Sequence, residues 1–179
     1  QPQYLRFEIG AAHDCAKYVV INKPFDCRLD LGTQGERKYP EELTAADWLT
    51  LHGLDTLRFC HQLDAATSGL LLAAKDKKSA AAATRLFAER KARKQYLALV
   101  FGHVQPGAHS RICVSLGPAP DSNFLQRVMP EGDGKPAETV LRVIRHGTLA
   151  LRGPYEGKAA SLLLLEPRTG RRHQLRVHC

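Results

Sequence analysis

The sequence lacks several features that mark common classes of protein. No apolar run is long enough to cross a membrane, and residues 1–9 show no signal-peptide pattern. The five cysteines are odd in number, irregularly spaced and never arranged as CxxC, which argues against a zinc ribbon or a thiol redox motif. We therefore expect free thiols in an intracellular, reducing compartment, with cytoplasm, nucleus and mitochondrion left open.

Clustered metal ligands are also scarce. His173, His178 and Cys179 lie close together in the sequence, but no fourth ligand stands at a recognisable spacing from them. We expect no metal site.

The sequence does contain enough apolar residues for a folded core, together with a surplus of positive charge. Its 179 residues are 44% hydrophobic, which suits one globular domain. Lys and Arg number 26 against 18 Asp and Glu, a net charge of +8. A surplus of this size favours a polyanionic partner.

Capping residues predict where two helices begin. Thr44 is a suitable N-cap for a short helix through Leu51, with Trp48 on its packed side. Ser79 is expected to cap an Ala-rich helix that runs to about Lys91.

Apolar runs and turn formers divide the rest of the chain into strands and loops. Residues 117–137, rich in Pro, Gly, Asp and Ser, predict a long surface excursion, and residues 31–40 predict a loop. A final helix is expected to open at His173. Strands are predicted at residues 18–24, 57–60, 70–74, 95–101, 140–144 and 161–165.

The most informative stretch is residues 61–72, HQLDAATSGLLL, in which one acid stands in a polar turn just before an apolar run. Thr67, Ser68 and Gly69 are turn formers, so Asp64 would lie on a loop that leads into a buried strand. From the fold alone, an Asp in such a turn serves only to accept hydrogen bonds from nearby backbone N–H groups.

This stretch resembles the HRLDxxTSGLLL motif of the RluA-type RNA pseudouridine synthases. Residues 94–102 resemble the KxYxALVxG segment of the same family, and residues 168–178 resemble its xTGRTHQIRVH segment. A weaker likeness lies at Asn22-Lys23-Pro24. HQLD and the ending Val177-His178-Cys179 are similar to a eukaryotic branch of the family. Three long motifs in the family order make the likeness specific, and it spans most of the chain.

The resemblance implies an α+β fold with a mixed, mostly antiparallel sheet flanked by helices and a central catalytic cleft. Residues 1–179 would form one RluA-like catalytic domain, with no S4-like RNA-binding module visible before it. Family members continue with further strands beyond the position of Cys179, so we expect the domain to be incomplete at its C-terminal end.

The resemblance also implies the chemistry. The family isomerises uridine to pseudouridine in RNA by breaking the N1–C1′ bond, rotating the base and joining C5 to C1′. No redox change occurs, so no cofactor is expected. By resemblance Asp64 is the carboxylate that acts either as a nucleophile at C1′ or as a base at C2′, and the sequence does not choose between these routes.

Two further residues complete the implied catalytic group. Asp64 must stay ionised when RNA covers it, and a permanent cation beside it favours that state. By resemblance Arg176 supplies the cation, so we predict an Asp64–Arg176 ion pair; the alternative is that Arg176 binds backbone carbonyls. Tyr96 matches the family's active-site Tyr, which would stack on uracil and help to remove the C5 proton. Otherwise Tyr96 is an ordinary strand aromatic.

Other motif residues are candidate substrate contacts. Gln62 replaces the Arg of HRLD and loses its charge and stacking plane, which bears on how the nucleotide is everted and which RNA is chosen. Lys23 would contact a phosphate or else be a solvated surface Lys, and Leu175 would pack on the base or belong to the core. The predicted substrate-binding residues are Lys23, His61, Gln62, Leu63, Thr67, Ser68, Gly69, Arg171, His173 and Leu175.

The leading hypothesis from the sequence is therefore an RNA pseudouridine synthase that acts on tRNA or rRNA, without membrane or metal, as a monomer. The alternative is a catalytically impaired RNA-binding pseudoenzyme of the same fold. Gln62, the short C-terminus and Phe25-Asp26-Cys27-Arg28, which follows Pro24 where the family continues with Gly, favour the alternative. Intact Asp64, Tyr96 and Arg176 favour the enzyme. The three motifs argue against a third hypothesis, a protein-interaction scaffold with incidental charge.

Overall fold

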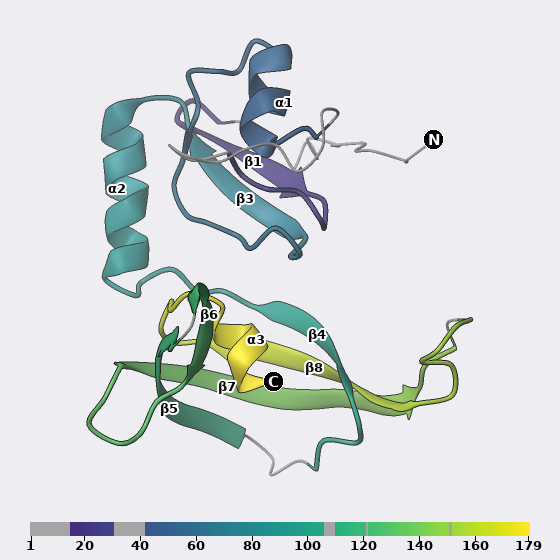
Figure 1. Ribbon diagram of the computed structural model, residues 1–179. Coiled ribbons are helices and arrows are strands. Elements are labelled where there is room, and N and C mark those ends of the chain that lie inside the picture. The colour runs from purple at the N-terminus through teal and green to yellow at the C-terminus, as the bar shows by residue number, and fades with distance from the viewer. Residues whose placement is uncertain (1–14, 31–41, 106–109, 121, 151) are drawn as a thin grey trace. The chain divides into compact units, whose positions relative to one another are not determined.

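A computed structural model describes residues 15–30, 42–105, 110–120, 122–150 and 152–179 of the chain (Figure 1). Backbone contacts divide it into two compact units, Gln1–Lys91 and Ala92–Cys179, which we call unit 1 and unit 2 and describe separately. The loop predicted at residues 31–40 lies outside the described residues.

Unit 1 is built on a three-stranded antiparallel sheet in the order β1-β3-β2. Its strands are β1 (Tyr18–Lys23), β2 (Arg58–Phe59) and β3 (Gly69–Ala74). The central strand β3 pairs with β1 along its whole length, from Tyr18 opposite Ala74 to Lys23 opposite Gly69. The predicted strands 18–24 and 70–74 are confirmed, whereas the strand predicted at residues 57–60 is only two residues long.

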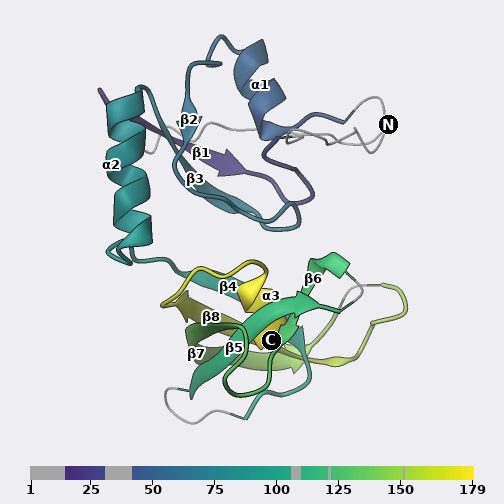
Figure 2. The ribbon, with the colours of Figure 1, turned by 60° about the vertical axis from the view of Figure 1, so that its left-hand side comes forward.

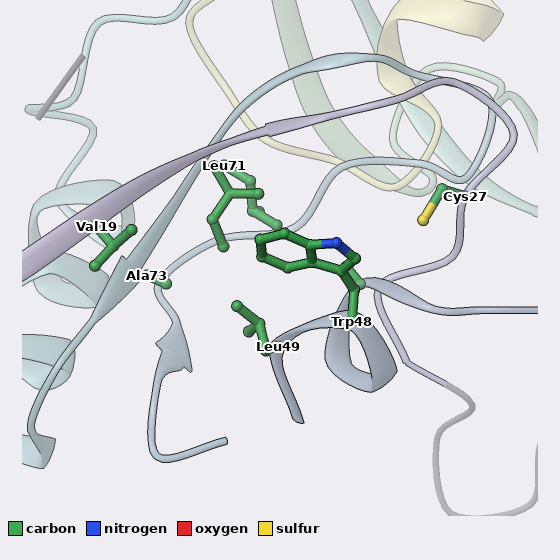
Figure 3. Close-up of a cluster of buried hydrophobic side chains, with 8 residues drawn as sticks. Val19, Cys27, Trp48, Leu49, Leu71 and Ala73 are labelled. Atoms are coloured by element: carbon green, nitrogen blue, oxygen red, sulfur yellow. The ribbon is translucent and has the colours of Figure 1, made fainter. Parts of the chain in front are cut away.

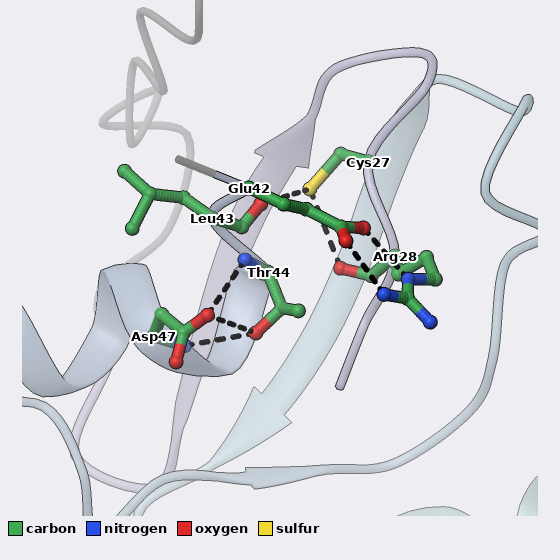
Figure 4. Close-up of polar contacts among 6 residues, drawn as sticks. All are labelled: Cys27, Arg28, Glu42, Leu43, Thr44 and Asp47. Atoms are coloured by element: carbon green, nitrogen blue, oxygen red, sulfur yellow. Dashed lines mark hydrogen bonds and ion pairs between the residues drawn. The ribbon is translucent and has the colours of Figure 1, made fainter. Parts of the chain in front are cut away.

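The first helix, α1 (Ala45–Leu51), begins where the sequence predicts. Thr44 adopts an extended backbone, and its hydroxyl accepts a hydrogen bond from the Asp47 N–H at 3.1 Å (Figure 4). The Asp47 carboxylate accepts in turn from the Thr44 N–H at 2.9 Å. This reciprocal capping satisfies two backbone donors at the start of the helix.

Trp48 then projects from α1 into the core of unit 1, as predicted. Its side chain is 8% exposed and lies among Leu71, Leu49 and Cys27 (Figure 3). The ion pair between Arg28 and Glu42, with Nη2 and Oε2 2.6 Å apart, joins the segment after β1 to the segment before α1 (Figure 4).

The N-cap of the second helix, α2 (Lys77–Ala88), lies three residues before Ser79, so the predicted cap is wrong. Asp76 is the N-cap, and its carboxylate accepts from both the backbone N–H and the hydroxyl of Ser79, at 2.8 and 2.7 Å. Both residue types are good caps. Asp76 takes the role because the chain leaves the extended conformation there, at φ −144° and ψ 163°.

Unit 2 is a five-stranded antiparallel sheet in the order β4-β8-β7-β5-β6. Only one helix, α3 (Gln174–His178), is assigned among the described residues of this unit. The strands are β4 (Tyr96–Phe101), β5 (Ser110–Ala119), β6 (Ser122–Val128), β7 (Lys135–Thr148) and β8 (Ala159–Pro167).

The surface excursion predicted at residues 117–137 is wrong, because this segment forms the end of β5, all of β6 and the start of β7 (Figure 1). Gly117 lies within β5, where an added Cβ would stand 2.9 Å from Cγ of Met129, so there a small residue that makes room for a neighbour was misinterpreted as a turn former. Gly132 and Gly134 do lie in a turn, between β6 and β7, at φ 90° and 74°.

The two faces of β4 differ in burial, as the predicted alternation requires. Tyr96, Ala98 and Val100 pack on the core of unit 2, which centres on Leu141, Leu163 and Leu165. Leu97, Leu99 and Phe101 lie on the other face and are 60–67% exposed. The chain is therefore an α+β protein with antiparallel sheets and few helices, as expected, although its strands form two sheets and not one.

Candidate active site

Asp64 lies in a turn that leads into β3, as the sequence predicts. The Thr67 N–H donates to the Asp64 carbonyl at 3.0 Å, which closes the turn over residues 64–67. We call this segment the Asp64 turn. Gly69 follows it at φ 128°, a conformation that strongly favours glycine, and the chain enters β3 there. Asp64 is half-buried.

Lys23 is buried beside this turn and is not a surface residue. Its side chain is 0% exposed, and its ammonium group donates to the carbonyl oxygens of Pro24, Cys27 and Ala65 at 2.8, 2.8 and 3.1 Å. A phosphate contact and a solvated lysine would both need Lys23 at the surface, so the predicted surface position of Lys23 is wrong. Lys23 instead joins the end of β1 to the Asp64 turn.

The charge on Lys23 is costly to bury, and nearby acidic groups offset part of that cost. Burial is the largest effect and lowers the pKa of Lys23 below its usual value. Charges on Cys27, Asp64 and Asp26 act in the opposite direction. The Asp64 carboxylate thus interacts electrostatically with a buried lysine of its own unit.

Two motif residues that we predicted as substrate contacts make structural contacts in unit 1. His61 Nε2 accepts from the Leu72 N–H at 3.0 Å, and its ring centroid lies 4.7 Å from that of Phe87 in α2. Leu63 packs against the core around Trp48. These contacts join the segment before the Asp64 turn to β3, to α2 and to the core around Trp48.

The remaining motif positions in unit 1 lie at or near the surface. Gln62 and Ser68 are exposed, and Thr67 is half-buried with its backbone N–H in the turn. Gly69 has nothing within 4 Å of an added Cβ, so space alone does not require glycine there. Their predicted contacts with substrate stay predictions.

In unit 2 the second and third motifs lie side by side. A Cβ placed on Gly170 would lie 3.6 Å from the ammonium nitrogen of Lys94. Tyr96, the first residue of β4, is half-buried and pairs with Leu165 of β8. Leu175 of α3 is half-buried and packs on the same core as Tyr96, and its predicted contact with the base stays a prediction.

A buried polar network, the Gln174 network, fixes the third motif to β7. Gln174 Nε2 donates to the Glu138 carbonyl and to the Thr139 hydroxyl oxygen, both at 2.9 Å. Gln174 Oε1 accepts from the Thr169 hydroxyl at 2.7 Å and from the Arg171 N–H at 3.0 Å. All four hydrogen-bonding positions of this amide are used, so the turn before α3 has one well-determined conformation.

His178 extends the network from the last turn of α3. Its Nδ1 lies 2.9 Å from the Thr139 hydroxyl. Burial lowers the pKa of His178, which favours the neutral ring. Because Thr139 already accepts from Gln174, its own hydroxyl hydrogen is available to His178 Nδ1.

The basic residues of the third motif differ in their surroundings. Arg171 Nε donates to the Pro136 carbonyl at 3.0 Å. His173 stands before α3 in a left-handed conformation at φ 51° and makes no side-chain capping bond. Arg176 lies on α3 and is exposed. The network therefore places this helix, and the helix carries Arg176.

The predicted catalytic residues belong to different units: Asp64 to unit 1, Tyr96 and Arg176 to unit 2. The Asp64–Arg176 ion pair, the stacking role of Tyr96 and the central cleft stay predictions. Among the described residues, no group of three or more His, Cys, Asp and Glu side chains is placed to hold a metal ion. In the same part of the chain no helix is long and apolar enough to span a membrane.

The sequence analysis missed three residues that organise these segments, Lys23 as an anchor and Thr139 and Gln174 as network members. Gln174 stands inside the third motif, between His173 and Leu175, and only its place in that motif could have pointed to it. No sequence signal distinguishes a buried Lys23 from a surface lysine before the structure is known.

Comparison with known proteins identifies the family. Residues 17–179 match the family model described as RNA pseudouridylate synthase. The chain is 40% identical over 184 residues to RNA pseudouridylate synthase domain-containing protein 1 of Bos taurus, and covers 54% of that protein. It is 37% identical over 118 residues to the dual-specificity RNA pseudouridine synthase RluA of Escherichia coli, covering 49% of it.

Structural similarity agrees with the sequence matches. The chain superimposes on the solved structure of human RNA pseudouridylate synthase domain containing 1 with a TM-score of 0.76 and 35% identity, covering 93% of this chain and 62% of the human one. The chain spans about half the length of the curated relatives it matches. From the family model, the relatives and the structural match together, the chain belongs to the RNA pseudouridylate synthase family.

Proposed function

We propose that the chain isomerises uridine to pseudouridine within RNA. The observation that carries the proposal is the family match across residues 17–179, which includes all three motifs with Asp64, Tyr96 and Arg176 intact. The turn that holds Asp64 and the network that holds α3 both give defined backbone positions to the residues that would act.

In the proposed reaction Asp64 either attacks C1′ or removes the C2′ proton, and the N1–C1′ bond breaks with its electron pair passing to the uracil. The base rotates, and its C5 forms the new bond to C1′; in the first route the Asp64–C1′ ester bond breaks as this bond forms, and in the second Asp64 returns the proton to C2′. Tyr96 helps to take the proton from C5, and N1 ends with a proton. Arg176 would keep Asp64 ionised once RNA has displaced water.

The charge of the chain supports an RNA substrate and favours unit 2 as the part that binds its phosphates. Residues 92–179 contain 13 Lys and Arg against 6 Asp and Glu, whereas residues 1–91 contain 13 against 12. Unit 2 therefore carries +7 of the net charge of +8. Phosphate contacts by such residues give an affinity that falls steeply with salt.

The finer proposals are that the RNA is a tRNA or an rRNA and that the chain acts as a monomer in an intracellular, reducing compartment. Cys27, Cys60, Cys113 and Cys179 are free thiols, which supports the compartment. The E. coli relative is named as a dual-specificity RNA pseudouridine synthase, which supports an RNA substrate without selecting one.

The test separates the enzyme from an RNA-binding pseudoenzyme. The full chain is incubated with tRNA and rRNA that contain uridine tritiated at C5, and tritium released to water is counted. Release from one RNA class, with an affinity that falls as salt rises, is the expected result. Salt-dependent RNA binding with no tritium release from either RNA class would favour the pseudoenzyme. An RNA affinity that does not change with salt concentration would contradict both RNA hypotheses.

A further inference from the structure

The edge strand β6 of unit 2 exposes large apolar side chains. It forms one end of the five-stranded sheet and pairs with β5 alone among the described strands. Phe124, Leu125 and Val128 are 70, 62 and 50% exposed. An edge strand with exposed apolar side chains favours association, so their exposure indicates a partner surface.

One of these side chains, Phe124, already lies beneath a cation. The Arg172 guanidinium lies over the Phe124 ring, with its central carbon 4.4 Å from the ring centroid. The two residues come from different segments, because Arg172 precedes α3, and α3 contacts β6 (Figure 2). The neighbouring Arg171 is tied to the Pro136 carbonyl, which restricts the backbone that carries Arg172.

Arg172 also departs from the family pattern. The xTGRTHQIRVH segment has Thr where this chain has Arg172, so the pair with Phe124 is a property of this chain and not of the quoted motif. Arg127, on the same strand as Phe124, is exposed and adds a second cation. An exposed aromatic ring beneath a guanidinium group combines the two features that bind single-stranded nucleic acid.

We propose that Phe124 and Arg172 form a stacking platform for an unpaired nucleotide of the RNA substrate, at a position other than the modified uridine. The proposal rests on the proposed function and adds a contact that selects single-stranded RNA. The base stacks on the exposed ring of Phe124, while Arg172 neutralises an adjoining phosphate. A base inside a duplex is already stacked on its neighbours and gains nothing from the platform.

Binding of fluorescein-labelled RNA, followed by anisotropy, tests the platform without turnover. Phe124→Leu keeps an apolar side chain but loses the ring, and we expect it to weaken binding of a single-stranded oligouridine about tenfold. Phe124→Tyr should restore the wild-type affinity, which also shows that the strand tolerates substitution. Binding of a blunt RNA duplex of equal length should not change.

The matched control is Tyr155→Leu. Tyr155 is 52% exposed in the same unit, and the Lys158 ammonium lies 5.2 Å from its ring centroid, so it is a second exposed aromatic under a cation. We expect oligouridine binding to be unchanged in this variant. An equal loss in Tyr155→Leu and Phe124→Leu would show that any exposed ring contributes and would overturn the proposal.

Two other outcomes would also overturn it. Wild-type affinity in Phe124→Leu would remove the platform, even if tritium release continues. A concentration-dependent dimer that Phe124→Leu abolishes, with RNA binding unchanged, would identify a second copy of the chain as the occupant of β6. If the wild-type chain releases no tritium but its binding of oligouridine still depends on Phe124, the proposed function alone is contradicted.

Discussion

Replacing Lys23 with Met tests whether a buried ammonium group holds the Asp64 turn in place. Met has a similar length but donates no hydrogen bond, so the carbonyls of Pro24 and Cys27 lose their lysine donor. The Ala65 carbonyl loses less, because it also accepts from the Cys27 N–H at 3.0 Å. The perturbation therefore removes the lysine from the link between the end of β1 and the Asp64 turn and leaves the backbone bond from Cys27 to Ala65 in place.

The expected loss of stability follows from these three bonds. A hydrogen bond from a charged donor is worth about 1.5–3 kcal/mol net, and the Met variant no longer has to bury a charge. Burial already lowers the pKa of Lys23, so removing the buried charge offsets part of the loss. We therefore take the lower end of the range for each hydrogen bond. Counting two full bonds and a weaker third, we expect Lys23→Met to lower the free energy of unfolding by roughly 3 kcal/mol.

Urea unfolding followed by the fluorescence of Trp48 measures this loss directly, because Trp48 is the one tryptophan of the chain and lies in the core of unit 1. Lys78→Met is the matched control, since Lys78 is exposed in α2 and Met and Lys have similar helix propensity. We also expect the kcat for tritium release to fall more than KM rises. If Lys23→Met had the unfolding midpoint of the control, or were destabilised but kept a normal kcat, Lys23 would not be holding the Asp64 turn in place.

Three further predictions concern the hydrogen bonds of α2 and α3. Thr139→Val removes the hydroxyl shared by Gln174 and His178 and should cost about 2 kcal/mol in thermal unfolding, whereas Thr139→Ser should cost less because it keeps that hydroxyl. Burial lowers the pKa of His178 below 6.5, so the unfolded chain takes up this proton first; stability should fall as pH drops from 6.5 through the folded pKa, and His178→Gln should flatten that part of the curve. Hydrogen bonds from Ser79 lower the pKa of Asp76 below 3.8, so its carboxylate stabilises α2 above that pH; Asp76→Ala should be less stable at pH 7, and the difference should vanish as pH falls through the folded pKa. An Asp76→Ala deficit that persists in strong acid, or a pH profile that His178→Gln leaves unchanged, would contradict the respective assignment.

Local signals in the sequence were sufficient where a side chain acts on its own backbone. Thr44 predicted the start of α1 because capping depends on residues within one turn. The alternation in β4 predicted which side chains face the core, since successive strand residues point to opposite faces. The motif around Asp64 predicted a turn and then a strand, and both are present.

The failures share a physical cause, which is that the relevant partner is distant in the sequence. Gly117 resembles a loop residue until Met129, 12 positions away, is seen to pack against it within the sheet. Lys23 resembles a surface lysine until the Ala65 carbonyl, 42 positions away, is seen to accept from it. Gln174 is fixed by Thr139, 35 positions away. Composition and periodicity contain no information about such contacts.

The central claim is that the carboxylate of Asp64 performs the chemistry, and single-turnover tritium release from C5-labelled RNA at saturating protein tests it most directly. Asp64→Asn keeps the size of the side chain and removes its charge. Asp55→Asn, at an exposed position of the same unit, is the control for an equal change in net charge. The account predicts wild-type RNA affinity in both variants, a normal rate in Asp55→Asn, and loss of release in Asp64→Asn. Release from Asp64→Asn at the wild-type rate would contradict it.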